Sequence, residues 1–512
     1  MPASLGSILH ETTRTFPNKP AVIFAGEATS YERLESMTNA VSSCLRHNGI
    51  RKGDRIGLYC INSPEFVAAY YGIVHSGAVV VPINLLLAAE EIAYILANAE
   101  VRGLIFHEAY AKTVEKVAAS VGSLSVRIVV GKPSINADIP LSDVLKEPTS
   151  NVGFPSVDAN DLAAIMYTSG TTGKPKGAML SHANLVANVS ATQEAMKVTS
   201  DDVFLVVLPM FHSFAATVGM HLPIMAGATI SAMLRFSPDD VGKTIEETNA
   251  TIFLGVPSMY TILANLSEGR RADLSSLRIA VSGGSALPVE ILNRFERIYG
   301  VPVHEGDGPT ECGPVTTFNP VGRDRKPGTI GVPIPSVEMY IADPDGKPLS
   351  TGEIGEICVR GPSVMKGYLN DPHATAESFY EDWFRTGDMG FVDEDGYYSI
   401  VDRLKDMIIV NGINVYPRQI EEIIYRHPAV HEVAVVPEPD RLHGEVPRAV
   451  ISLKPGQTSS EKEIVALCRQ HLGRHQVPRI VDFVDELPKT ASGKILKREL
   501  TQNRANNERG IE

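Results

Sequence analysis

The sequence predicts an α/β protein: a large N-terminal domain of parallel sheets covered by helices, followed by two smaller β-containing units. Up to about residue 320, apolar strand-like runs alternate with helical patterns, as in parallel sheets. From about 320 to 402, short β-rich pieces separated by Gly, Pro and Asp turns indicate a small barrel-like or antiparallel subdomain. Residues 404–512 mix both patterns, so we expect an α+β C-terminal domain after an N-terminal domain of residues 1–403.

The C-terminal unit has recognisable element signals. Pro417 is placed to open a helix that buries Ile420, Ile423 and Ile424. Ser460 and Glu463 form a capping-box signature for a second helix, expected to carry Ile464, Leu467, Cys468 and Leu472. A strand is predicted between the two helices.

Bulk composition limits the classes of function. The chain has 512 residues, 44% apolar content and a formal net charge of −13, which argues against a nucleic-acid partner. Its five cysteines are scattered and show no CxxC pair, which fits a reducing cytoplasm and gives no metal framework. We see no signal peptide or membrane span. Peripheral membrane contact and the oligomeric state, including a homodimer, stay open.

Three predicted strands end in loops of polar chemistry. Leu162–Met166 runs into a Thr-rich loop and then a helix capped near Ser181. Leu277–Val281 runs into a Ser-Gly-Gly-Ser loop before a helix near Pro288, and a short apolar run is followed by residues 305–311. Ligands of open α/β sheets bind outside the carboxyl ends of the strands, so we expect these loops to converge on one crevice.

The Thr-rich loop, YTSGTTGKPKG over residues 167–177, has the composition of a phosphate-binding loop. Glycines allow close backbone approach, and hydroxyls, ammonium groups and free N–H groups bind phosphate oxygens. The spacing differs from the common P-loop, because Pro175 stands where that motif needs its Gly-Lys. The candidate phosphate-binding residues are Thr168, Ser169, Gly170, Thr171, Thr172, Gly173, Lys174 and Lys176.

Four further motifs follow in order, and together with this loop they carry a resemblance. They are GDGPTE over 306–311, WFRTGD over 383–388, DRLKD over 402–406 and PKTASGK over 488–494. With them the chain resembles the acyl-adenylate-forming superfamily of acyl-CoA synthetases, firefly luciferase and adenylation domains. It looks most like a medium- or long-chain fatty acyl-CoA synthetase.

The resemblance implies a two-step reaction. A small carboxylic acid attacks the α-phosphate of ATP, giving acyl-AMP and pyrophosphate, and the thiol of coenzyme A then displaces AMP. Thr310 would bind a phosphate oxygen, and Glu311 would hold Mg²⁺, a hard cation that prefers carboxylate and phosphate oxygens. Lys494 would stabilise the charge that develops at the α-phosphate.

The same resemblance assigns nucleotide and hinge residues. Asp388 would accept hydrogen bonds from the ribose hydroxyls, and Arg403 would also bind the nucleotide. Lys405 would be the hinge about which a mobile C-terminal domain swings between the two half-reactions. Gly412 would leave room for the pantetheine arm of CoA. The remaining candidate contacts are Gly284, Ser285, Asp307 and Gly308.

His212 bears on the acid that is activated. Amino-acid-activating members of the family usually carry Asp here, and His cannot replace that anion, so amino-acid activation is disfavoured. The surrounding residues predict an apolar acyl pocket: Phe211, Phe214, Phe253, Val256, Pro257, Tyr260 and Gly284. A fatty acid is the favoured substrate and an aryl acid the alternative.

One residue departs from the family pattern. An aromatic residue that stacks on adenine usually precedes the Gly of the Thr-Glu motif, whereas this chain has Asp307. Asp cannot stack, although it could accept from the adenine amino group. We therefore expect unusual base recognition with the chemistry kept.

Three other functions stay open: loading of a carrier protein from fatty acyl-AMP, an inactive nucleotide-binding homologue, and luciferase-like oxidation. The presence of Glu311 and Lys494 stands against the inactive homologue. Gly412 and the hinge favour thioester formation without identifying the thiol.

Overall fold

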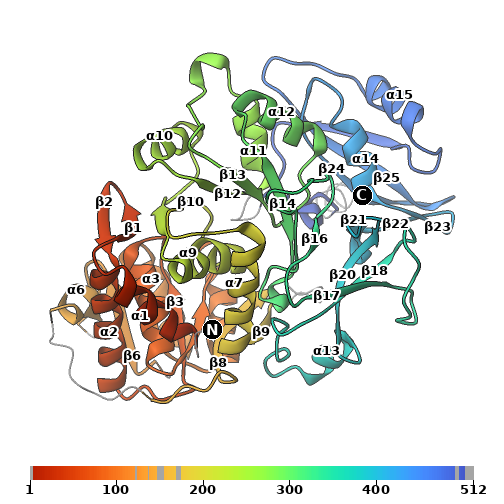
Figure 1. Cartoon of the computed structure of the whole chain (residues 1–512). Coiled ribbons are helices and arrows are strands. Elements are labelled where there is room, and N and C mark those ends of the chain that lie inside the picture. Colours follow the sequence, from red (N-terminus) through yellow and green to blue (C-terminus); the bar gives the residue numbers. More distant parts are fainter. Residues whose placement is uncertain are drawn as a thin grey trace.

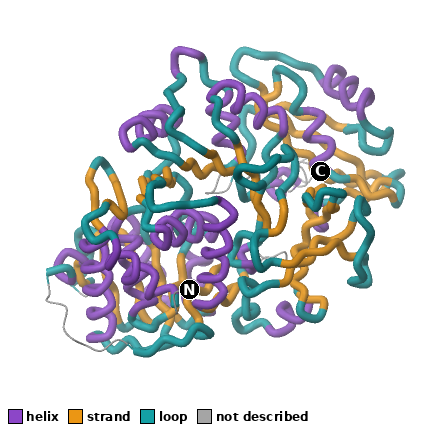
Figure 2. Tube along the Cα trace, in the orientation of Figure 1, coloured by secondary structure: helices purple, strands orange, loops and turns teal. Residues whose placement is uncertain are grey.

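The computed structural model describes residues 4–121, 124–136, 138–146, 155–168, 174–489 and 495–501. Within these residues the chain forms four β-sheets, two large ones followed by two of five strands each. Figure 1 follows them along the chain from red to blue. Figure 2 shows helices gathered around the strands of the N-terminal part, while the region after the large sheets consists mainly of strands and loops.

The first large sheet carries the Thr-rich loop. It has the order β7-β6-β5-β3-β4-β8-β9, and every pairing is parallel except the last, β8 with β9. Its strands are β3 (Arg55–Tyr59), β4 (Val79–Pro82), β5 (Val101–His107), β6 (Val126–Val130), β7 (Ile139–Pro140), β8 (Leu162–Thr168) and β9 (Lys176–Ser181).

The second large sheet carries the other two loops. Its order is β16-β15-β14-β13-β12-β10-β11-β1-β2, with a parallel centre from β14 to β1 and antiparallel strands at both edges. Its strands are β1 (Pro20–Phe24), β2 (Glu27–Ser30), β10 (Val203–Val206), β11 (Thr229–Ala232), β12 (Ile252–Gly255), β13 (Ile279–Ser282), β14 (Val303–Asp307), β15 (Thr317–Phe318) and β16 (Val332–Pro333).

Helices cover these two sheets, and serine side chains cap several of their N-termini, for example Ser30, Ser63 and Ser181. A π-helix over Thr217–His221 joins α8 to α9. The helices are α1 (Leu5–Thr15), α2 (Tyr31–His47), α3 (Pro64–His75), α4 (Ala89–Asn98), α5 (Ala111–Val121), α6 (Leu141–Val144), α7 (His182–Met196), α8 (Ser213–Ala216), α9 (Leu222–Ala226), α10 (Pro238–Thr248), α11 (Pro257–Ala264) and α12 (Val289–Tyr299).

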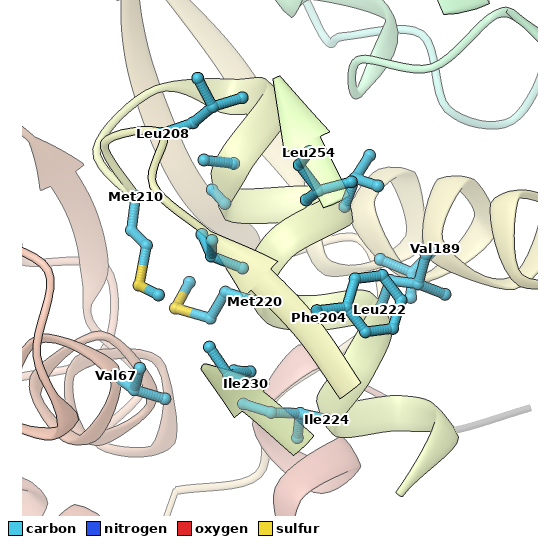
Figure 3. Packing of buried hydrophobic residues seen from close by; sticks show 14 of the residues in the cluster. Val67, Val189, Phe204, Leu208, Met210, Met220, Leu222, Ile224, Ile230 and Leu254 are labelled. Carbon is cyan, nitrogen blue, oxygen red and sulfur yellow. The ribbon is translucent and has the colours of Figure 1, made fainter. Parts of the chain in front are cut away.

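The main hydrophobic core lies behind the polar loops. Figure 3 shows Phe204 of β10 packed beside Leu222 of α9 and Val189 of α7, and all three are fully buried. Burying a side chain of this size contributes about 2 kcal/mol. Because α7 and the α8–α9 segment also contact the loop after β14, this core gives the loop a rigid support.

The two smaller sheets are separate. The first is antiparallel and contains β17 (Glu338–Ala342), β18 (Gly355–Arg360), β19 (Phe379–Tyr380), β20 (Trp383–Val392) and β21 (Tyr398–Arg403), with α13 (Pro372–Glu377) beside it. The second contains β22 (Ile408–Val410), β23 (Ile413–Val415), β24 (Val430–Asp440), β25 (Gly444–Leu453) and β26 (Ile480–Val484), with α14 (Pro417–Ile424) and α15 (Glu461–His471). It has its own core, which includes Ile420, Ile424 and Ile464.

The predicted α/β class is confirmed, and two local expectations need correction. A strand, β9, lies between the Thr-rich loop and the helix capped by Ser181, so the loop joins an antiparallel hairpin. Pro175 and Gly177 hid this short strand from the sequence pattern. Leu472 is the extended residue that ends α15, and the helix stops at His471.

Candidate active site

The Thr-Glu motif is where two of the polar loops meet. Thr310 and Glu311 lie in a 3₁₀ turn directly after β14, and Glu311 is only 8% exposed. Thr168, at the end of β8, donates from Oγ1 to Oε1 of Glu311 at 3.3 Å. Tyr368 donates to the same oxygen at 2.8 Å. The ends of β8 and β14 therefore converge, although the strands belong to different sheets.

The hydroxyl of Thr310 is held from the helix that follows His212. Its Oγ1 lies 2.9 Å from Oγ of Ser213, which is buried. His212 itself caps α8, with Nδ1 accepting from Phe214 N at 3.4 Å. The predicted phosphate-binding and acyl-pocket residues are thus joined through adjacent residues of one short helix.

The loop after the motif is clamped by a buried asparagine. Asn188 of α7 donates from Nδ2 to Cys312 O at 3.2 Å and to Val315 O at 2.7 Å, and its Oδ1 accepts from Val315 N at 3.2 Å. Thr217 of the π-helix donates to Gly313 O at 3.1 Å. The clamp satisfies the amide of Asn188 inside the protein, as buried polar groups require.

The Thr-rich loop is described only at its ends. The candidates Ser169, Gly170, Thr171, Thr172 and Gly173 lie outside the described residues. At the ends, Thr168 and Lys176 are register partners of β8 and β9. Lys176 Nζ lies 5.3 Å from the centre of the Tyr368 ring, and Lys174 Nζ lies 5.6 Å from that of Tyr94. Both ammonium groups therefore make cation–π contacts at the base of the loop.

The candidate ribose and nucleotide residues face each other across β20 and β21. Asp388 and Arg403 are register partners, and Arg403 Nε lies 3.2 Å from Asp388 Oδ1. The carboxylate of Asp388 is buried, while the Arg403 side chain is 53% exposed. The Asp388 charge is the main cause of a raised pKa of Arg403, and the Asp307 charge contributes. The carboxylate of Asp307 is therefore close enough to interact electrostatically with the Arg403 guanidinium.

Gly308 is required by a close backbone approach. A β-carbon at this position would lie 1.6 Å from Pro314 O and 2.7 Å from Pro314 C. Only glycine fits, and this brings Asp307 and Thr310 close to the chain that returns after the motif.

A narrow apolar pocket lies next to these residues. Its free volume is about 10 Å³, which is about the room one water needs. Of the residues expected to line it, Phe253 and Tyr260 are fully buried and pack edge to face in the core instead. Ser285 is exposed beside it. The lining residues are Leu208, Pro209, His212, Phe214, Ala215, Val256 and Gly284.

The hinge and CoA candidates lie on the C-terminal side. Lys405 is exposed in a 3₁₀ turn between β21 and β22. Gly412, with φ +77°, follows Asn411, with φ +52°, in the turn between β22 and β23. Two left-handed residues are typical of a type I′ hairpin. The positive φ that this turn requires is a sufficient structural reason for a glycine at position 412, independent of CoA binding.

Lys494 lies outside the described residues, but the chain on both sides of it is anchored. Lys489 and Ile495 form an antiparallel bridge, and Leu496 N donates to Pro488 O at 2.8 Å. Lys497 Nζ lies 2.8 Å from Glu421 Oε1 on α14. The residues that flank the segment containing Lys494 therefore lie next to each other, close to α14.

Helix α14 contacts the start of α12, near which it is drawn in Figure 1. Charged side chains of α14 lie near the buried carboxyl of Glu305. Arg418 N donates to Asp402 Oδ2 at 2.8 Å, and Val289 N donates to Glu422 Oε2 at 3.5 Å. Burial raises the pKa of Glu305 to about 7; Arg418 opposes this rise and Glu422 adds to it. Gly328 N donates to Glu305 Oε2 at 3.1 Å.

Glu305→Gln should remove a pH dependence of stability. Because the pKa of Glu305 is raised on folding, its stabilising contribution is complete below about pH 4.5 and is lost as the pH rises to about 7. The difference in unfolding free energy between the variant and the unchanged protein should grow by about 2 kcal/mol, in favour of the variant, as the pH rises from 5 to 8. Urea unfolding at several pH values measures this.

The matched control is Glu394→Gln, at an exposed position. It should leave the pH profile of stability unchanged. If the unfolding free energies of Glu305→Gln and the unchanged protein change with pH in parallel, Glu305 has the same pKa in the folded and unfolded states.

Sequence reasoning did not find Tyr368, Ser213, Asn188 or Glu305. Tyr368, Ser213 and Asn188 each contact a motif that lies far away in the chain. Glu305 stands directly before the GDGPTE motif, but its burial depends on tertiary contacts that the sequence does not reveal. For Tyr368, the only local feature that could have drawn attention is the run Lys366-Gly367-Tyr368. This run has no defined spacing to Glu311, so the sequence does not pair the two residues.

The described segments contain neither a candidate membrane span nor a cluster of metal-binding side chains. No helix there is both long and apolar enough to cross a membrane. No cluster of three or more His, Cys, Asp or Glu side chains there could hold a metal ion.

Comparison with known proteins identifies the family. Residues 9–369 match the AMP-binding enzyme family, and residues 419–494 match the AMP-binding enzyme C-terminal domain. A long-chain-fatty-acid–CoA ligase of Bacillus subtilis is 36% identical over 98% of this chain and 95% of its own. A feruloyl-CoA synthase of an Amycolatopsis species is 38% identical over 97% of this chain and 98% of its own.

A solved structure agrees. The anthranilate CoA ligase AuaEII in complex with anthranoyl-AMP superposes with a TM-score of 0.92, 30% identity and 99% coverage of both chains. The sequence matches span almost the whole chain, and the structural match includes both the large sheets and the C-terminal sheet. The chain therefore belongs to the AMP-binding enzyme family, as an AMP-forming acid–CoA ligase that uses ATP, Mg²⁺ and CoA.

Proposed function

We propose that this protein joins medium- to long-chain fatty acids to CoA through an acyl-AMP intermediate. The observation that carries the proposal is the meeting of Thr168, Thr310 and Glu311 beside an apolar pocket that contains His212. The phosphate, metal and acyl groups of one reaction would thereby lie next to one another. The Bacillus subtilis relative, matched over nearly its full length, supports the fatty-acid assignment.

Each residue role follows from the chemistry of its side chain. Lys174, Lys176 and Thr168 would bind the phosphates that leave as pyrophosphate, and Thr310 would donate to a phosphate oxygen. Glu311 supplies the buried carboxylate that fits Mg²⁺, whose charge would offset that of the phosphates. Asp388 and Arg403 would bind the ribose end of the nucleotide.

We also propose that residues 1–403 and 404–512 act as two domains hinged at Lys405. Support comes from the separate core of the C-terminal sheet and the exposed turn that holds Lys405. The contacts between α14 and Val289 would have to break when the domain turns. All five cysteines are free, which fits the proposed cytoplasmic location.

A second candidate is an aryl-CoA ligase. The pocket does not separate the two candidates, because a free volume of about 10 Å³ accommodates neither a fatty chain nor an aromatic ring unless side chains move. The feruloyl-CoA synthase and anthranilate ligase relatives act on aryl acids by their names. The two candidates differ only in the acid and share every catalytic residue.

Pyrophosphate release over a panel of fatty and aryl acids, with and without CoA, tests the proposal. We expect release with fatty acids of medium to long chain and an acyl-CoA product when CoA is present. A preference for feruloyl-type acids would select the aryl ligase. Release without a CoA thioester would point to carrier-protein loading, and silence with every acid would overturn the enzymatic function.

Asp307→Tyr tests base recognition. A tyrosine would provide a stacking surface for adenine and remove a negative charge near Arg403. We expect the apparent KM for ATP to fall about fivefold, which corresponds to a stacking gain of about 1 kcal/mol, with kcat changed less. An unchanged KM would mean that residue 307 does not face the base.

A further inference from the structure

We propose that Tyr368 is a positioning residue that orients the Glu311 carboxylate for Mg²⁺ and, through its ring, holds Lys176 for the phosphates. The inference rests on the metal and phosphate roles proposed above for Glu311 and Lys176. It adds a residue from outside the predicted motifs and couples two parts of the site through one side chain.

The side chain makes two different contacts. Its hydroxyl donates to Glu311 Oε1 at 2.8 Å, and its ring lies 5.3 Å from Lys176 Nζ. A hydrogen bond to a charged group is among the stronger polar contacts, and a cation over a ring is attracted by the ring quadrupole.

The backbone around Tyr368 fixes where the side chain points. Tyr368 forms an antiparallel bridge with Ala178 of β9, and Tyr368 N donates to Thr375 Oγ1 at 2.9 Å. On either side, Leu369 N donates to Gly177 O at 2.8 Å and Met179 N donates to Gly367 O at 2.9 Å. The segment is therefore hydrogen-bonded along the outer edge of β9, next to the β8–β9 hairpin.

Glu311 is held by the same segment at its main chain. Met365 N donates to Glu311 O at 2.7 Å, while Tyr368 and Thr168 both donate to Oε1 of the side chain. With one carboxylate oxygen fixed by two donors, the carboxylate plane cannot rotate freely. Fixed ligand geometry matters for Mg²⁺, which demands near-ideal octahedral coordination.

Tyr368→Phe separates the hydroxyl from the ring. The variant keeps the surface under Lys176 and removes only the bond to Glu311. Calorimetric titration should show binding of Mg²⁺-ATP weakened about tenfold, the loss expected for one hydrogen bond to a charged group, while ATP in EDTA binds within twofold of the unchanged protein. The Mg²⁺ concentration for half-maximal pyrophosphate release should rise in parallel.

The matched control is Tyr398→Phe, because Tyr398 is also buried and donates to a backbone oxygen, Met339 O, at 2.8 Å. It should leave the ratio of the two ATP affinities unchanged. Thr168→Val removes the weaker donor to Glu311 and, because Thr168 is also a proposed phosphate ligand, should weaken both affinities. If Tyr368→Phe does not fold, Tyr368→His decides the question, because it keeps a ring but is too short to reach Glu311 as the hydroxyl does, and it should show the same Mg²⁺-specific loss.

An equal loss of both affinities, or no loss, in Tyr368→Phe would overturn the positioning role. Pyrophosphate release by the unchanged protein is measured independently. If the unchanged protein releases pyrophosphate and Tyr368→Phe shows no Mg²⁺-specific defect, the proposed function stands and the positioning role of Tyr368 is wrong.

Discussion

Lys494→Ala should abolish formation of acyl-AMP while sparing most of the second half-reaction. A positioned cation that stabilises charge at the α-phosphate is worth about a hundredfold to a thousandfold in rate. The loss should therefore appear in acid-dependent pyrophosphate release. Thioester formation from supplied acyl-AMP and CoA should fall less than about fivefold, because the proposed domain rotation takes Lys494 away from that step.

The control is Lys462→Ala, an exposed lysine on α15 of the same domain. It should leave both half-reactions unchanged and so exclude a general effect of lost positive charge. Equal losses in both half-reactions of Lys494→Ala would contradict the domain rotation. Full activity in both would remove Lys494 from the site.

The sequence could predict the motifs because each is a contiguous run of residues with its own chemistry. Thr310 and Glu311 lie beside Thr168, as the convergence of strand ends requires, even though β8 and β14 belong to different sheets. Asp388 and Arg403 proved to be direct register partners, a relation that spacing alone does not reveal. The α/β class followed from the alternation of apolar runs and helical patterns.

The rest depends on tertiary contacts. Asn188 clamps Val315 across 127 positions, and Tyr368 reaches Glu311 across 57, so no local pattern announces either contact. Aromatic residues near the pocket motif were expected to line the pocket, yet Phe253 and Tyr260 pack into the core. Core residues and pocket-lining residues have the same hydropathy, so the sequence cannot tell them apart. Only their burial in the folded structure does so.

Gly308→Ala should disable the enzyme without touching a reacting group. The added methyl would lie 1.6 Å from Pro314 O and 2.9 Å from Thr316 N, and both are backbone atoms that cannot rotate away. Either the returning chain or the Thr310–Glu311 turn must move by more than 1 Å. Displacement on this scale costs about a hundredfold in rate, and overpacking costs about 3 kcal/mol of unfolding free energy.

Gly269→Ala is the matched control, because a β-carbon there meets no described atom within 4 Å. Its activity and urea midpoint should stay within error of the unchanged protein. For Gly308→Ala, the urea midpoint should fall and the kcat/KM for ATP should fall with it. If the variant keeps both, the close approach of Gly308 to Pro314 does not exist in solution. If stability falls while kcat/KM for ATP is kept, the position of the Thr-Glu turn does not set the rate.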